Sequence, residues 1–439
     1  MPDSGIFYGA LLNTRSLIAA SPWFLLAVLL VVYDLFPWMS DALGIFHPMW
    51  LIAALMAAVL VMHEWGFRRI RFSDFRWTMG DLLFFGFVGM VGASLLWSDI
   101  EQQSRALRYL FAALLFPYCF ARFASPRDIR VFAWSVPALS AGLMILVLIS
   151  LAALGYRVLA QERVYLFWGL PAHQVFPIDM AFLALSMVAI PPSFCAKRAY
   201  FRVLIAGIVF LSVATIALLG ARAVLVACVA TVSLVLVLGA WQPVRFRLAY
   251  FVTIICAIVF AVSISPPEKR WFFGQLLDIQ SIPHEVPRIP DECKIKDNSM
   301  AIRTILYREG IAAFVENPLT GVGAGRFGFY SCYYEHEGEF NSPHSTVIHA
   351  FSELGLIGGV LFLAPMLWAV YWVLQQIARW RDGQSNLVLL VGPMFIFCVI
   401  LDQMSSSYLT ALHYYLLLGI IVALRWQSVR SGGDTLAAK

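Results

Sequence analysis

His344 is the residue whose type and position first suggest chemistry. It follows Ser342 and Pro343 in the stretch NSPHSTVIHAFSELGLIGGV, where a polar segment gives way to a long apolar one. Serine is a common N-cap and proline a common first helical residue, so this pattern predicts His344 in the first turn of a helix. Free backbone N–H groups at such an end attract anions. The imidazole is therefore either a capping or hydrogen-bonded structural group or a functional one.

Arg222 is the second candidate, because it interrupts two apolar runs in the stretch LLGARAVLVA. A guanidinium without a partner is costly in such surroundings, so Arg222 needs an anion nearby. The partner is either a carboxylate, such as that of Glu353 or Asp179, or an anionic ligand. As a further alternative, the side chain extends to the membrane interface.

Three further arginines lie in less apolar stretches. Arg163 occurs in GYRVLAQERVYLFWG, whereas Arg303 and Arg308 occur in NSMAIRTILYREGIAAF. The second stretch predicts an amphipathic helix from Asn298, on which these two arginines lie about 140° apart and need not share a ligand. Together the arginines favour an anionic ligand, with a solvated outer face as the alternative for Arg308.

The sequence that follows this helix predicts a tight turn. Pro318 should end the helix, and Gly321, Gly323 and Gly325 allow the chain to reverse. Glycine-rich loops that bind phosphate open a helix, whereas this one follows a helix. We therefore expect a structural turn and no phosphate cradle.

The histidines and cysteines predict no metal site, and we expect no cofactor. His336, His344 and His349 lack the spacing of ligands on one helix face, and no cluster of cysteines or carboxylates accompanies them. Cys293 and Cys332 both lie in a long polar segment. If that segment faces an oxidising compartment, the two cysteines can form a disulfide.

The composition identifies the class of protein that must position these residues. Hydrophobic residues make up 61% of the chain, charged residues only 13%, and the mean hydropathy is +0.79. A soluble domain carries about 25% charged residues, so the chain is predicted to be an all-α polytopic membrane protein. The net charge of +5 is small for this length and indicates no nucleic-acid partner.

About twelve transmembrane helices are expected at roughly twenty residues per span. They fall near 16–34, 49–63, 80–97, 105–121, 130–153, 175–194, 203–219, 223–240, 248–265, 346–374, 387–402 and 408–425. Every second connection is rich in Lys and Arg, which predicts that these connections and both termini are cytoplasmic. The basic connections are 68–76, 122–130, 197–202, 245–247 and 379–381.

This topology divides the chain into three parts. Nine transmembrane helices are expected in 1–265, one large periplasmic loop with short helices in 266–345, and three transmembrane helices with a cytoplasmic tail in 346–439. His344, Arg222, Arg303, Arg308 and Arg163 then all lie on the periplasmic side.

Two motifs resemble those of known proteins. HSTVIHAFSELGLIG, with His344, Ser345, Gly355 and Gly358, resembles the pattern of O-antigen ligases, the membrane glycosyltransferases that attach O-antigen to lipid A–core. RTILYREGIAAFVENPLTGVGAGRF is similar to the wider ligase and polymerase superfamily, in which an arginine precedes an aromatic residue by four and a P-x-x-G-x-G turn follows. The aromatic residue here is Tyr307, where tryptophan is usual. The expected topology also resembles that of the ligases.

This resemblance implies a GT-C-type glycosyltransferase in the bacterial inner membrane, surrounded by the lipid bilayer and with a periplasmic active site. The donor would be O-antigen on undecaprenyl pyrophosphate, and the acceptor a sugar hydroxyl of lipid A–core. Arg222 and Arg303 would bind the diphosphate, with Arg308 and Arg163 as further candidates. Metal would not be required. His344 would be the base of an inverting displacement, or alternatively a cation that binds phosphate.

Two other functions remain open on the sequence. An O-antigen polymerase would use the same lipid-linked donor, although the Arg-x10-Gly motifs of polymerases are absent around the outer arginines. A transporter or flippase of lipid-linked anions would show inverted internal repeats, and none is apparent.

Overall fold

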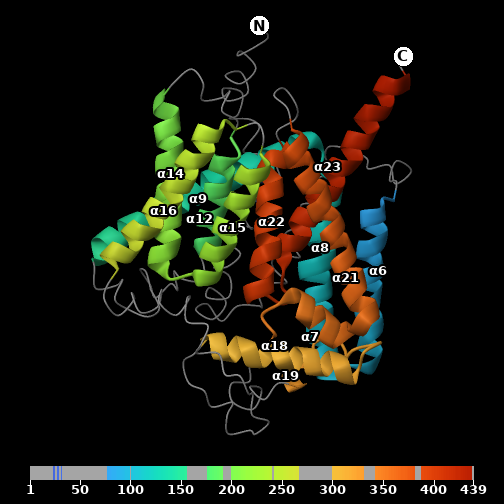
Figure 1. Cartoon of the computed structure of the whole chain (residues 1–439). Helices are drawn as coiled ribbons and strands as arrows, with labels where there is room; N and C mark the ends of the chain where they lie inside the picture. Colours follow the sequence, from blue (N-terminus) through green and yellow to red (C-terminus); the bar gives the residue numbers. More distant parts are fainter. Residues whose placement is uncertain are drawn as a thin grey trace.

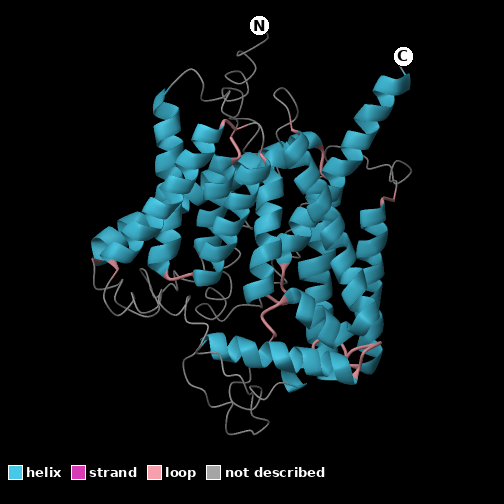
Figure 2. Cartoon of the chain, in the orientation of Figure 1, coloured by secondary structure: helices cyan, strands magenta, loops and turns pink. Residues whose placement is uncertain are grey.

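The computed structural model describes 77–98, 100–155, 176–190, 199–239, 242–265, 299–330, 342–380 and 387–437, with a few helical residues between 23 and 31. Within these ranges the chain forms helices joined by short loops and contains no strand (Figure 2). This confirms the all-α prediction for the described part of the chain. The principal helices are α6 (Met79–Ser94), α7 (Ile100–Tyr109), α8 (Phe116–Arg122), α9 (Pro126–Leu154), α12 (Pro177–Val188), α14 (Ala199–Leu219), α15 (Arg222–Leu238), α16 (Val244–Ile264), α18 (Ser299–Glu316), α19 (Phe327–Tyr330), α21 (Thr346–Arg379), α22 (Leu387–Ser405) and α23 (Leu412–Ala437).

Six of the described helices are long and apolar enough to cross a membrane. They are Met79–Trp97, Pro126–Leu154, Tyr200–Leu219, Val244–Ile264, Thr346–Arg379 and Leu387–Ser405, and α12 and α15 are shorter apolar helices. Most of the expected spans coincide with described helices. The expected spans near 16–34 and 49–63 lie largely outside the described residues, so the count of twelve stays a prediction.

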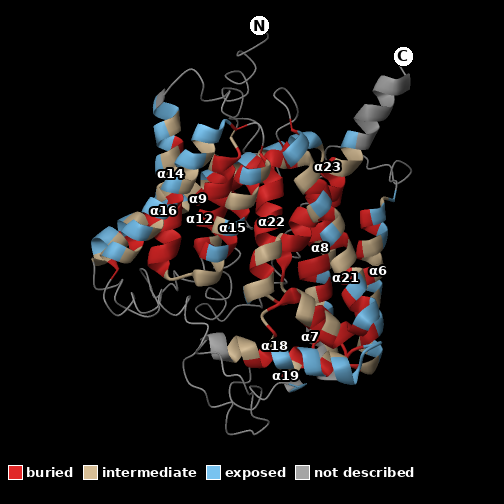
Figure 3. Ribbon diagram, in the orientation of Figure 1, coloured by how far each residue is buried: buried red, intermediate tan, exposed pale blue. Residues whose placement is uncertain are grey.

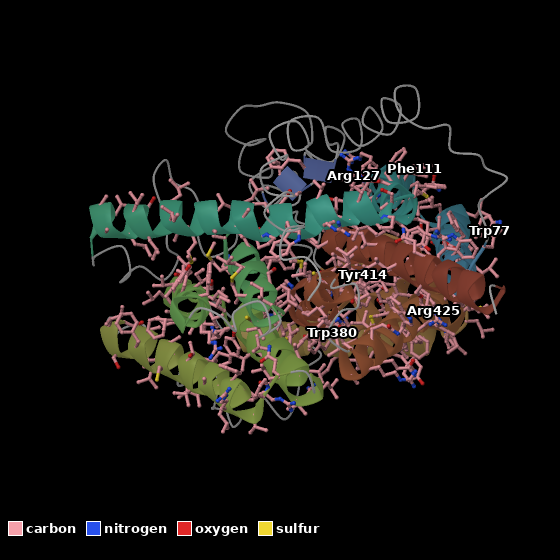
Figure 4. All side chains as sticks on the ribbon, turned by 90° about the horizontal axis from the view of Figure 1, so that it is seen from above. Trp77, Phe111, Arg127, Trp380, Tyr414 and Arg425 are labelled. Carbon is pink, nitrogen blue, oxygen red and sulfur yellow. The ribbon has the colours of Figure 1, made fainter. Side chains whose placement is uncertain are left out.

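The helices form two groups that meet at α15 and α22 (Figure 1). In one group α6 packs against α21 and α8 against α23, while α22 contacts both α21 and α23. In the other group α14 packs between α12 and α16, and α9 contacts α12. Seen from above, α9 runs along one side of the assembly from the first group to the second (Figure 4).

Burial follows the pattern expected of helices in a lipid bilayer. Buried residues fill the interior of α12, α15, α22 and α8, whereas α14 and α16 expose much of their outer faces (Figure 3). The outer faces carry exposed large apolar side chains, among them Ile149, Val252, Ile255 and Val259. A soluble protein rarely exposes so many, so these faces suit contact with lipid.

An ion pair stabilises the end of the bundle where α6 begins and α8 ends. Asp81, in the first turn of α6, lies 2.8 Å from the Arg122 Nε atom and accepts a hydrogen bond from Tyr118. Both partners of the pair are buried. Arg122, one of the basic residues from which the orientation was predicted, is therefore a packed residue whose charge is matched.

At the opposite end α18 lies across the bundle, where α21 begins and α22 ends (Figure 1). It begins at Ser299 and ends at Glu316, close to the predicted start at Asn298 and stop at Pro318. Gly310 faces Ile348 and Pro343, so the helix packs directly on the start of α21. This contact brings α18 and its arginines to the segment that carries His344.

Candidate active site

His344 precedes α21 by two residues, so the predicted place in the first helical turn is wrong. The helix begins at Thr346, and its N-cap is Ser345, whose Oγ accepts a hydrogen bond from the Ile348 N–H at 3.4 Å. His344 has a φ of 53°, in the left-handed region that histidine adopts more readily than most residues. The predicted cap, Ser342, is therefore also wrong, and Ser345 caps the helix.

The two ring nitrogens of His344 have different surroundings. A backbone hydrogen bond at Ser405 raises the pKa of the imidazole, which identifies the Ser405 carbonyl as the acceptor. Nδ1 of this ring is buried and has no hydrogen-bond partner among the described residues.

The surroundings of His344 also favour its neutral form. Burial lowers the pKa of the imidazole below the usual 6.5, and the positive charge of Arg303 lowers it further. His349 acts in the same direction with a smaller effect, and the bond to Ser405 opposes them. A neutral imidazole is the form that a general base requires near neutral pH.

Arg303 is electrostatically coupled to both Arg222 and His344. The Arg222 guanidinium at the first residue of α15 is half-buried and is repelled by the charge of Arg303. Burial lowers the pKa of Arg303 itself, and neighbouring Tyr307 opposes this effect. Two cations that are partly buried and repel each other create a field that favours a bound anion.

Tyr307 lies one turn after Arg303 on α18. Its hydroxyl donates a hydrogen bond to the Gln403 carbonyl at 3.1 Å, near the C-terminal end of α22. Burial raises the pKa of this tyrosine, and the charge of Arg303 opposes the shift. The phenol therefore stays protonated near neutral pH and ties α18 to α22.

The glycine-rich loop after α18 is a structural turn, as predicted. Gly321, Gly323 and Gly325 all have positive φ, and the Gly323 N–H donates to the Glu353 carbonyl at 2.8 Å. Gly355 also has a positive φ, of 65°, and interrupts α21, where the Leu356 N–H donates to the Pro318 carbonyl at 2.7 Å. The loop thus pairs backbone to backbone with the break in α21.

Gly355 breaks α21 instead of letting a continuous helix pack closely on a neighbour. A Cβ at Gly321 would overlap the backbone of Glu353, and a Cβ at Gly355 would overlap that of Leu319. Gly358 does allow a close approach to a neighbouring helix, because a Cβ there would lie 3.1 Å from Met90 on α6.

Glu353 is a buried carboxylate whose role the sequence does not reveal. Its carboxylate accepts hydrogen bonds from the N–H groups of Gly325 and Phe327, at 2.8 and 2.9 Å, and from the Tyr408 hydroxyl at 2.8 Å. His349 Nε2 lies 3.1 Å from the same carboxylate. These contacts fix the glycine-rich loop to α21, which weighs against Glu353 as the partner of Arg222. The sequence feature that could have indicated this role is a histidine and a glutamate four residues apart in an apolar span.

The structure describes only one of the remaining predicted residues. Arg308 is exposed on α18. Arg163, Cys293 and Cys332 lie outside the described residues, so their predicted roles stay predictions. Among the described residues no group of three His, Cys, Asp or Glu side chains is arranged to hold a metal ion.

Comparison with known proteins adds one finding. Residues 207–363 match a family model described as O-Antigen ligase. The comparison with curated proteins gives no match. The matched stretch contains Arg222, Arg303 and His344, the three residues that the fold brings together.

Proposed function

We propose that the chain, whose residues 207–363 match the O-antigen ligase family model, is a membrane glycosyltransferase of lipopolysaccharide synthesis. It transfers O-antigen polysaccharide from undecaprenyl diphosphate to a sugar hydroxyl of lipid A–core. The active site lies at the end of the bundle that α18 covers, on the periplasmic side of the inner membrane. The observation that carries this proposal is the packing of α18, which bears Arg303, on the start of α21 beside His344. The charge of Arg303 acts on both His344 and Arg222.

Arg222 and Arg303 bind the diphosphate of the donor. Each guanidinium presents several N–H donors in a planar fork that matches phosphate oxygens. The mutual repulsion of these two cations is relieved when an anion lies between them. The first turn of α15 also favours a bound anion, because its N-cap, Ala221, makes no side-chain hydrogen bond to the first-turn N–H groups.

His344 acts as the general base. The acceptor hydroxyl oxygen attacks the anomeric carbon of the donor sugar, and its proton passes to the neutral imidazole. The bond between the anomeric carbon and the phosphate oxygen breaks, and its electron pair leaves on undecaprenyl diphosphate. Direct displacement inverts the configuration at the anomeric carbon. The two arginines stabilise the negative charge that develops on the leaving diphosphate, so no metal ion is needed.

The test is transfer by the purified protein in liposomes. Lipid-linked O-antigen and lipid A–core are supplied with excess chelator, and the joined glycolipid is resolved by gel electrophoresis. We expect the joined product with the wild-type protein and with Arg245→Ala, a matched control near the start of α16 at the other end of the bundle.

Three results would contradict the proposal. Extension of the donor chain without transfer to lipid A–core would identify a polymerase. Movement of the donor across the bilayer without any new glycosidic bond would identify a transporter. Transfer that stops with chelator and returns with a divalent ion would overturn the metal-free mechanism.

A further inference from the structure

The C-terminal end of α22 contacts both elements that carry the proposed catalytic groups. The side chain of Gln403 reaches the start of α21, just after His344, whereas its backbone carbonyl accepts the hydrogen bond from Tyr307 on α18. Two residues further on, the Ser405 carbonyl accepts the bond from the His344 ring. One short segment therefore touches the helix of Arg303 and the imidazole of His344.

Both polar atoms of the Gln403 side-chain amide form hydrogen bonds. Oε1 accepts hydrogen bonds from the Ser345 hydroxyl and the Val347 N–H, each at 3.2 Å. Nε2 donates to the Thr346 hydroxyl at 2.7 Å and to the Val399 carbonyl at 3.2 Å. A backbone N–H can only donate and a carbonyl can only accept, so Val347 and Val399 fix which end of the amide is which.

These bonds fall on the three residues that follow His344 in the chain. Ser345 is the N-cap of α21, and Thr346 and Val347 are its first helical residues. Because His344 directly precedes the cap in a left-handed conformation, the orientation of the cap determines where its imidazole points. The Gln403 amide holds this cap against α22.

We propose that Gln403 is a positioning residue for glycosyl transfer, a role that rests on the function proposed above. Its side chain sets the position of the His344 imidazole, and its carbonyl, through Tyr307, sets the position of the helix that carries Arg303. Gln403 thereby fixes the separation between the base and the diphosphate-binding guanidinium. It takes no part in proton transfer and binds no substrate.

A positioning role predicts a specific kinetic signature. Gln403→Leu keeps the size of the side chain and removes all four amide hydrogen bonds. It should slow single-turnover transfer by about 10- to 100-fold, the range expected for a small misplacement of reacting groups. Donor binding should persist, because Arg222 and Arg303 remain. Gln403→Glu keeps the acceptor oxygen and loses the donor, so it should lie between Leu and the wild type.

The decisive comparison measures the effect of Gln403→Leu on the transfer rate in the wild-type protein and in the His344→Ala variant. If Gln403 acts through His344, Gln403→Leu should slow transfer in the wild-type background and have little further effect on His344→Ala, since the group that it positions is already absent. Gln427→Leu is the matched control. It removes a side-chain amide bond to the Ala124 carbonyl, of 2.9 Å, and should change neither rate nor donor binding.

The outcomes separate this inference from the proposed function. No joined product from the wild-type protein would overturn the proposed function. An active wild type with an equally active Gln403→Leu variant would overturn the positioning role alone, as would the same loss of rate in both backgrounds or a loss of donor binding. If Gln403→Leu fails to fold, Thr346→Val removes the 2.7 Å bond alone and must show the same dependence on His344.

Discussion

Arg303 lies close enough to His344 for its charge to lower the pKa of the imidazole, although one residue is on α18 and the other precedes α21. A cation beside a base has two effects. It keeps the base neutral, and it provides a site for the anion that the reaction releases. Both effects require the contact between α18 and the start of α21.

The two arginines should be distinguishable from His344 by their effect on donor binding. Arg222→Ala and Arg303→Ala each remove a charge-assisted contact to diphosphate, so each should weaken binding of lipid-linked donor by about 10- to 100-fold. Lysine at either position keeps the charge and loses the planar fork, so it should restore binding only in part. Equilibrium binding in detergent measures this, with Arg245→Ala as the control. Unchanged affinity in both alanine variants would contradict the assignment.

The pKa of His344 should depend on Arg303. In the donor-free protein the charge of Arg303 lowers this pKa, so Arg303→Gln should raise it towards 6.5, while burial still holds it below that value. The protonated fraction at a given acidic pH then increases. The rate at which diethyl pyrocarbonate modifies His344, followed by mass spectrometry across pH, reports the midpoint. A midpoint that stays constant or falls in Arg303→Gln would contradict the coupling.

Much of the architecture could be predicted because it depends on local pattern. The apolar runs predicted spans that coincide with helices, and Pro318 with the following glycines predicted the end of α18 and its turn. These features follow from the hydropathy of each stretch and from the backbone conformations that proline and glycine adopt. They therefore depend on residues that are close together in the sequence.

Other features depend on contacts between distant parts of the chain, which one sequence does not show. Gly355 resembles a packing glycine, and only the loop at Pro318 reveals that it breaks the helix. Gln403 occurs in an apolar span without any motif, and its role appears only where it meets the start of α21. The sequence predicted Ser342 as the cap of α21, whereas tertiary contacts favour Ser345.

The pairing of the glycine-rich loop with α21 predicts a large effect of a single methyl group. Gly321→Ala places a Cβ at positive φ and against the backbone of Glu353, so it should destabilise the fold by about 1–2 kcal/mol or more. Gly89→Ala on α6 is the matched control, because nothing lies within 4 Å of the added carbon. Thermal unfolding in detergent compares the two. Equal melting temperatures would contradict the close approach.

The prediction for the cysteines concerns residues outside the described ranges. If the segment 266–345 is periplasmic, Cys293 and Cys332 should be linked, because an oxidising compartment permits the bond. Mass spectrometry of non-reduced peptides should detect the linked pair. Two thiols that both react with an alkylating reagent before reduction would reject the disulfide.

The most direct test of the account is the effect of His344→Ala on two separate quantities. If His344 is the base, the variant should bind lipid-linked donor as the wild type does and transfer it about 10²–10⁴-fold more slowly in a single turnover. If His344→Ala instead loses donor binding as severely as Arg222→Ala and Arg303→Ala, the histidine is a phosphate ligand and the general-base mechanism is wrong.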